Sequence, residues 1–426
     1  MNITTTTEQG LIIGRVEKPE AETVSIYLSA QVCPENSPAI TAKMILFTEL
    51  LLSGTATFSR DQIQEKFRLL GSNIDVSYAA GRITLTVSTL ANKIKPTLTL
   101  LTQIINNPAF SLAEIKRAKQ TLINQLELAK EDAKGIAHAQ LNNAFIHSSD
   151  NRYKHSPESL SLCVTKISQS ELKAVHKLFL NRQWTMTVGG AESSLNTVIQ
   201  TIKKIKKGYL SEIPETVVAA LDSHKPAQLL QHEVKSKQNL ELSFGAALPL
   251  NLQNPDLAAF QFGLAVLGKW GGFAGRLMST VREKEGLTYG IYARTEEIGL
   301  TATGYWRIMS FFSPKDVKRG ITSTLREVKK IHEKGITTSE WERFIDILKT
   351  GERLTYDSLS STTALVHGNL LLGRSWVDYQ AYRQKLYSCT QKEVNLALRK
   401  YLLPQLVVIS IAGPVGKAKE DLATLF

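Results

Sequence analysis

The sequence lacks a long apolar run and has few cysteines. No stretch approaches 18 consecutive apolar residues, which excludes a transmembrane helix. The start, Met1 to Thr7, has neither the basic nor the apolar region of a secretory signal. We therefore expect a cytoplasmic protein, with a periplasmic location as the alternative if a signal peptide has been removed. Cys33, Cys163 and Cys389 are far apart and odd in number, which argues against a disulfide framework and a structural zinc cluster.

The histidines do not form a metal-binding pattern either. None of the eight makes a pair at i,i+4 spacing or lies beside a second ligand in a recognised zinc motif. The ordinary interpretation of each is a surface or hydrogen-bonded histidine. They are His138, His147, His155, His176, His224, His232, His332 and His367.

The net charge is strongly positive, yet no nucleic-acid-binding pattern accompanies it. The formal charge is +12, and the basic residues are spread along the chain. The densest run, Lys203 to Lys207, lies at an expected helix end, where lysine suits the helix dipole. Aromatic and basic residues do not alternate and no helix-turn-helix pattern is present, so we expect no nucleic-acid partner. The charge favours, at most, acidic proteins or peptide segments.

The two halves of the chain resemble each other. Ser168 to Val175 begins with a Ser-x-x-Glu capping box and is followed by the β-rich run Trp184 to Gly190. A Thr-x-x-Glu box opens Thr390 to Ala397, 222 residues later (390 minus 168), and Val407 to Gly413 follows it. This spacing indicates an internal repeat.

Other expected elements recur in the same order. We expect strands at 23–28, 73–78 and 82–87, and again at 240–245, 289–294 and 301–309. We expect helices at 38–53 and 113–129, and again at 255–267 and 339–352. The stretch 208–228, with Pro214 and Pro226, has little periodicity and is expected to be a linker between domains 1–207 and 229–426. Strand runs combined with helices predict an α+β protein of two tandem homologous domains, each a sheet covered by helices.

Two adjacent motifs in the second half indicate a family. The glycine-rich turn Leu267 to Leu277 precedes the segment Val281 to Gly290, which contains Arg282 and Tyr289. Together they resemble the second-domain signature of the pitrilysin/insulinase family of zinc peptidases, which includes mitochondrial processing peptidase. The resemblance covers nearly the whole chain and is strongest from Gly271 to Ala293. It implies a clamshell arrangement of the two halves.

The family's zinc site, an H-x-x-E-H motif with a distal glutamate, is missing. Aligning Ser53-Gly54-Thr55 with the end of the family's zinc helix puts the two histidine positions on Ile45 and Glu49 and the glutamate between them on Thr48. The distal glutamate position falls at or near Gln125. Isoleucine cannot ligate zinc and threonine is a poor general base. The resemblance therefore implies a member with no metal of its own.

Arg282 and Tyr289 match the family's arginine/tyrosine pair, which faces the zinc across the cavity, binds peptide and polarises the scissile carbonyl. The alternative is structural: Arg282 would pair with Glu283 or Glu285, and Tyr289 would pack in the core. The resemblance also implies that Gly271, Gly272 and Phe273 contact substrate. Because this glycine turn is short, close packing of the backbone is an equally good explanation.

These observations predict the zinc-free partner subunit of a heterodimeric metallopeptidase acting on unfolded peptides. The partner would be a sister chain with H-x-x-E-H that holds the zinc, or a second copy of this chain if no sister exists. The alternative is a non-enzymatic scaffold for assembly or peptide holding, like the family's respiratory-complex core proteins. A self-sufficient peptidase using Glu49 with other ligands is a third, weaker possibility.

Overall fold

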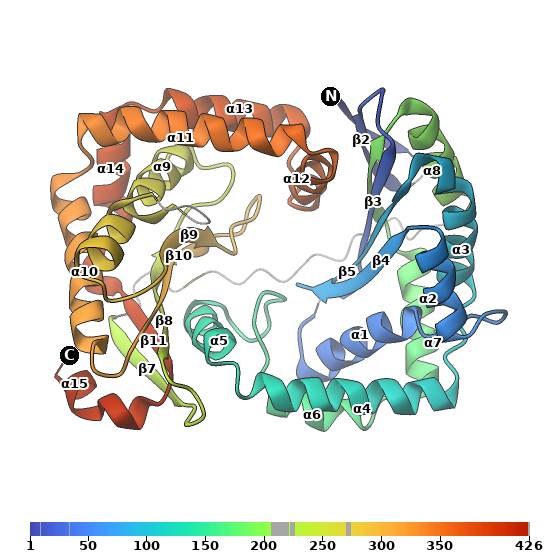
Figure 1. Ribbon diagram of the computed structural model, residues 1–426, viewed down its shortest axis with the longest axis horizontal. Helices are drawn as coiled ribbons and strands as arrows, with labels where there is room; N and C mark the ends of the chain where they lie inside the picture. The colour runs from blue at the N-terminus through green and yellow to red at the C-terminus, as the bar shows by residue number, and fades with distance from the viewer. Residues whose placement is uncertain (9, 34, 206–220, 222–225, 270–273, 425–426) are drawn as a thin grey trace.

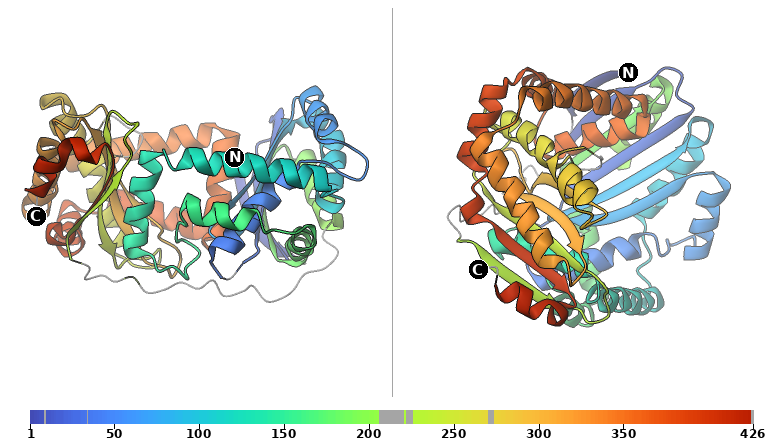
Figure 2. Two further views of the ribbon diagram at one scale, coloured as in Figure 1. Left: turned by 90° about the horizontal axis from the view of Figure 1, so that it is seen from below. Right: turned by 60° about the vertical axis from the view of Figure 1, so that its left-hand side comes forward.

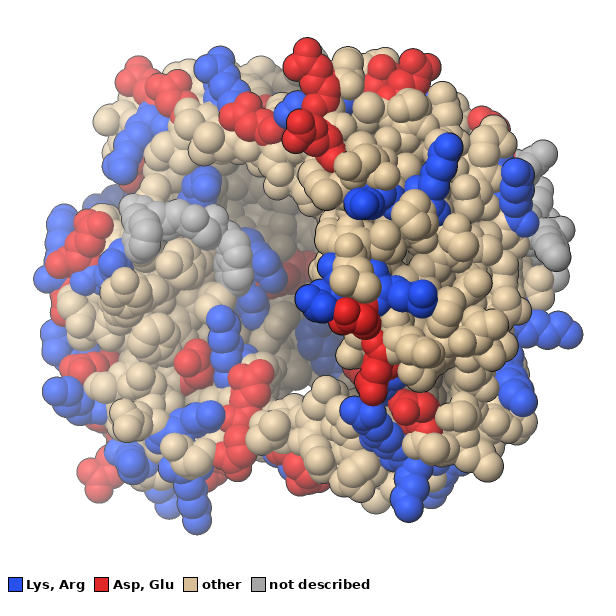
Figure 3. Space-filling model, turned by 45° about the vertical axis from the view of Figure 1, so that its right-hand side comes forward, with Lys and Arg blue, Asp and Glu red and all other residues tan. Residues whose placement is uncertain are grey.

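The computed structural model consists of two halves, each a mixed sheet with helices (Figure 1). The space-filling view shows a hollow between them (Figure 3). It describes residues 1–424 except 9, 34, 206–220, 222–225 and 270–273. The expected linker 208–228 therefore lies mostly outside the described residues. No helix in the described part is both long and apolar enough to cross a bilayer.

The first half forms a six-stranded sheet in the order β1-β2-β6-β3-β5-β4. Its strands are β1 (Asn2–Glu8), β2 (Leu11–Glu17), β3 (Thr23–Gln31), β4 (Asn73–Ala79), β5 (Arg82–Leu90) and β6 (Trp184–Gly190). Its helices are α1 (Pro38–Leu51), α2 (Arg60–Leu69), α3 (Ile94–Asn106), α4 (Leu112–Ala129), α5 (Ala133–Phe145), α6 (Pro157–Val164), α7 (Gln169–Asn181) and α8 (Glu192–Ile205).

The second half forms a five-stranded sheet in the order β7-β11-β8-β10-β9. Its strands are β7 (Gln228–Glu233), β8 (Leu240–Leu248), β9 (Ile291–Glu296), β10 (Gly304–Phe312) and β11 (Val408–Gly413). Its helices are α9 (Leu257–Gly268), the π-helix Met278–Lys284, α10 (Val317–Lys334), α11 (Thr338–Asp357), α12 (Leu359–Leu371), α13 (Trp376–Ser388), α14 (Gln391–Tyr401) and α15 (Lys419–Ala423).

The strand order confirms the internal repeat. Without β1, the first sheet reads β2-β6-β3-β5-β4, and the second has the equivalent order with the same directions. In each sheet one pair is parallel, β2 with β6 and β7 with β11, and the other neighbours are antiparallel. Both predicted capping boxes are also present, at Ser168 before α7 and at Thr390 before α14.

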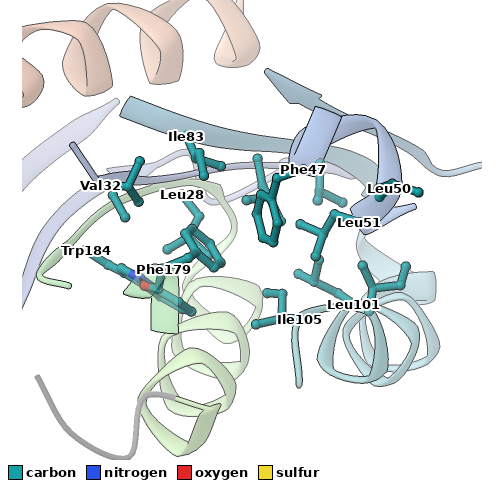
Figure 4. Close-up of a cluster of buried hydrophobic side chains, with 14 of the residues drawn as sticks. Leu28, Val32, Phe47, Leu50, Leu51, Ile83, Leu101, Ile105, Phe179 and Trp184 are labelled. Carbon is teal, nitrogen blue, oxygen red and sulfur yellow. Dashed lines mark hydrogen bonds between the residues drawn. The ribbon is translucent and has the colours of Figure 1, made fainter. Parts of the chain in front are cut away.

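Each sheet has an apolar outer face that packs on helices of its own half. Alternate residues of β5 are buried, as a half-buried strand requires. In the first half these residues meet α1, α3 and α7, and Figure 4 shows Phe47, Leu101 and Phe179 reaching the same core as Leu28 and Ile83. The core of the second half is built in the same way from β8, β10 and β11 with α9, α10 and α14.

The inner faces are covered by exchanged helices. Helix α5 of the first half packs on β8 and β11, and α12 of the second half packs on β6, β2 and β3 (Figures 1 and 2). Close approach depends on glycine: a Cβ on Gly189 would lie 2.1 Å from Thr363 Oγ1, and one on Gly14 would lie 2.9 Å from Leu370 Cδ1. Each half therefore contributes one helix to the packing of the other half's sheet.

Each exchanged helix carries a histidine that contacts the other half; His367 is buried and His138 is partly buried. His367 of α12 lies 2.8 Å from Ser29 Oγ and 3.0 Å from Thr187 Oγ1. His138 of α5 lies 3.2 Å from the hydroxyl of Tyr305 on β10. Burial lowers the pKa of each histidine to about 3, so both are neutral hydrogen-bonding groups at neutral pH.

Candidate functional site

Helix α1 has the position of a zinc helix but not its ligands. Ser37 caps it by accepting a hydrogen bond from Ile40 N at 3.2 Å. Ile45 is half-buried and packs against the first core. Thr48 is buried, and its hydroxyl donates to Ile45 O at 2.8 Å, so it is occupied within its own helix. Glu49 alone is exposed and able to bind a cation.

Gln125, at the distal glutamate position, is an exposed residue of α4, which packs against α1. A carboxamide is a poor zinc ligand, and the three α1 positions offer a single carboxylate. Among the described residues no three His, Cys, Asp or Glu side chains gather to hold a metal ion. The residues present therefore do not fit a zinc ion. The packing of Phe47, Leu50 and Leu51 holds α1 in place (Figure 4).

The structure brings the other two predicted site residues together. The guanidinium carbon of Arg282 lies 4.9 Å from the centre of the Tyr289 ring, within cation–π range. Tyr289 is 72% exposed, which is unusual for a large aromatic side chain. The structural alternative for Tyr289, a core residue, is therefore wrong. Glu285, one of the two carboxylates named above as possible partners of Arg282, pairs with Arg326 of α10.

The local backbone explains why Tyr289 points outward. Arg282 lies in a π-helix, a local form that is frequent at functional sites. Gly286 then takes a left-handed φ of 64° and ends this helix. Thr288 is buried and bonded to Ser310 of β10 at 3.2 Å, so the residue after it projects from a fixed base. Strand β9 starts at Ile291, so the prediction that Tyr289 begins a strand is wrong.

A charged cluster lies on strands β9 and β10, which follow this turn in the sequence. Arg294 of β9 and Arg307 of β10 face each other across the strands, and both bind Glu296, at 2.7 and 2.9 Å. Like charges in directly opposite positions are unfavourable, and the shared carboxylate offsets this. The same arginines, with Lys154, hold the pKa of His138 down after burial. Our sequence reasoning missed this cluster, although alternation in β9 and β10 would have placed both arginines on one face.

Gly271, Gly272 and Phe273 lie outside the described residues. The turn that contains them connects α9 to the π-helix. Gly275 follows it with a φ of 110°, and a Cβ there would lie 2.9 Å from the Cα of Gly268. At this end of the turn, close backbone packing accounts for the glycine.

Comparisons with known proteins agree with the two-half architecture. A model described as insulinase (peptidase family M16) matches residues 46–156, and one described as peptidase M16 inactive domain matches residues 166–348. The non-peptidase homolog YmxG of Helicobacter pylori is 22% identical over 358 residues, covering 82% of this chain and 79% of that protein.

Solved structures share the fold. A peptidase M16 inactive domain from Pseudomonas fluorescens superposes with a TM-score of 0.81 at 20% identity, covering 97% of this chain and 98% of that one. The periplasmic protease PqqL from Escherichia coli gives a TM-score of 0.71 at 14% identity, covering 97% of this chain and 46% of that one. With α1 lacking a zinc-binding set, the chain belongs to the insulinase family of peptidases, M16, as a member without its own zinc site.

Proposed function

We propose that this chain is the zinc-free partner subunit of a two-chain metallopeptidase that cleaves unfolded peptides. The observation that supports this most is the exposed Tyr289 stacked with Arg282 in a chain whose zinc positions hold Ile45, Thr48 and Glu49. A pair held outward on a fixed base suits a role toward a molecule outside the fold. A sister chain with H-x-x-E-H would complete the site.

The two side chains suit carbonyl chemistry. Arg282 offers a permanent positive charge and several N–H donors, and Tyr289 offers one neutral O–H donor. Donors aimed at the position of a developing oxyanion stabilise the transition state of peptide cleavage. Zinc on the sister chain would supply a Lewis acid and an activated water. This chain would orient the peptide and contribute part of the cavity wall.

The test is turnover by the complex reconstituted with the sister subunit. Tyr289→Phe removes one hydroxyl and keeps the ring, so the rate should fall ~100-fold or more while the subunits still associate. Arg282→Ala should also weaken peptide binding, because it removes a charged donor. Tyr27→Phe is the matched control. Tyr27 lies on β3 of the first sheet and stacks on His367 of α12, so loss of its hydroxyl should leave turnover unchanged.

The scaffold alternative makes the opposite prediction. If the chain only holds peptides or other proteins, Tyr289→Phe will leave the turnover of any co-purifying peptidase unchanged. The absence of an H-x-x-E-H partner from complexes isolated with the chain would favour the scaffold as well.

A further inference from the structure

A small pocket with both apolar and polar lining lies where the exchanged helix α12 meets the first sheet. Its volume is about 190 Å³, and Leu370, Leu371 and Gly373 at the end of α12 form one side. The other side comes from the ends of strands in the first sheet and from the residues just before β6. The polar side chains that line it are Ser29, Gln31, Arg82, Arg182, Gln183 and Thr185.

The charge in this pocket is one-sided. Two guanidinium groups line it, and no carboxylate of the described residues does. Arg82 makes no ion pair within the described part of the chain. Its guanidinium donates a hydrogen bond of 3.2 Å to the carbonyl of Leu371 instead. Burial alone accounts for the lowered pKa of Arg82, with no carboxylate contributing.

A half-buried arginine without a carboxylate partner is costly, because its charge has lost part of its water shell. The carbonyl of Leu371 lies at the C-terminus of α12, where the helix dipole is equivalent to roughly half a negative charge. That interaction offsets part of the Arg82 charge and uses one of its five N–H donors. A bound anion would satisfy the remainder.

We propose that this pocket binds a small oxyanion, a carboxylate or phosphate group, between Arg82 and Arg182. The carboxamides of Gln31 and Gln183 and the hydroxyl of Thr185 provide further donors of the kind that surround such groups. A pocket for a drug-sized ligand measures ~300 Å³ or more, so this one takes a single acidic group or a very small acid. Because both halves line the pocket, its ligand would bind α12 to the first sheet.

The first test uses the full chain, with inorganic phosphate and propionate as separate probes and chloride at equal ionic strength as reference. The unfolding midpoint should rise by about 2 °C or more at saturating probe. Arg82→Gln should weaken the probe's affinity by about tenfold or more, since a charged hydrogen bond is lost. Arg117→Gln, an exposed arginine of α4, should respond as the unaltered chain does.

A response to phosphate alone assigns a phosphate group, and a response to propionate alone assigns a carboxylate. Responses to both assign a general oxyanion site. No response to either probe overturns the proposal. An equal response in Arg82→Gln also overturns it, because the stabilisation would then be a bulk effect of the salt.

The second test does not depend on the folding of Arg82→Gln. Gln183→Glu has nearly the same shape and places a carboxylate in the pocket. This variant should unfold at a higher temperature than the original chain in chloride, and neither probe should add further stability. If Gln183→Glu keeps the full response, Arg82 is only a cap for the end of α12 and the proposal fails.

Discussion

Replacing Gly189 by alanine tests the close contact between β6 and the exchanged helix α12. The new Cβ would lie 2.1 Å from Thr363 Oγ1 and 3.1 Å from Leu359 Cδ1. Thr363 is fully buried, and its hydroxyl is held by a 2.7 Å hydrogen bond to Leu359 O, so it cannot turn away freely. Overpacking of this kind costs ~1–3 kcal/mol, and we expect a loss of that size in the free energy of unfolding.

The neighbouring glycine is a matched control. A Cβ on Gly190 would meet its nearest atom, Val24 Cγ2, at 3.5 Å, which is ordinary contact. Neither glycine has a positive φ. Gly190→Ala should therefore be neutral or gain up to ~1 kcal/mol, because alanine reduces the freedom of the unfolded chain.

Urea unfolding followed by tryptophan fluorescence gives both free energies. In a double-mutant cycle, Thr363→Ala should offset part of the loss from Gly189→Ala, with a coupling energy of ~1 kcal/mol or more, since the clashing oxygen is gone. Equal stabilities for Gly189→Ala and Gly190→Ala, or additive effects in the cycle, would refute the tight contact between α12 and β6.

Three further predictions concern the zinc content, one turn residue and one buried histidine. Dialysed protein should contain far less than one zinc per chain by atomic absorption; a ratio near one that is lost in Glu49→Ala would contradict this. Ala80, with a φ of 49° in the β4–β5 turn, should gain about 0.5–1 kcal/mol on Ala80→Asn in urea unfolding, since asparagine tolerates this conformation; a loss of stability would contradict it. His367, whose folded pKa of about 3 lies below its usual 6.5, takes up its proton only in the unfolded chain between these values. The free energy of unfolding should therefore decrease as the pH is lowered through this window, by about 1.4 kcal/mol per pH unit for this residue. His367→Gln should remove that contribution, and an unchanged pH profile would contradict the prediction.

Local patterns in the sequence were enough to predict the repeated architecture. Alternation predicted β3, β5 and β8, and capping boxes predicted the starts of α7 and α14. Strand β1 was missed because its threonine-rich sequence has no apolar alternation. The sequence predicted that the strand begins at Tyr289, whereas β9 begins at Ile291. The turn before it depends on the Thr288–Ser310 hydrogen bond, which joins residues that are distant in the sequence.

The helix exchange could not be predicted from the sequence. An amphipathic pattern shows that a helix buries one face but not which sheet receives it. The same limit applies to Arg82 and Leu371, which meet only because α12 crosses to the other half. The prediction that Arg282 and Tyr289 form a pair rested on their match to the family's motif. Their contact could be foreseen because only seven positions separate them in the sequence.

The exchange of α5 and α12 also sets an order of events during synthesis on the ribosome. The strands of the first sheet are complete once Gly190 has been made, but the helix that covers its inner face starts only at Leu359. Helix α5 likewise emerges before any strand of the sheet that it covers. For much of translation, the inner face of the first sheet must therefore be in contact with water. The central residues of this face are suited to exposure to water, because Ser29, Thr84 and Thr187 carry hydroxyl groups. Water can hydrogen-bond these hydroxyls until α12 has been synthesised and His367 packs against the sheet.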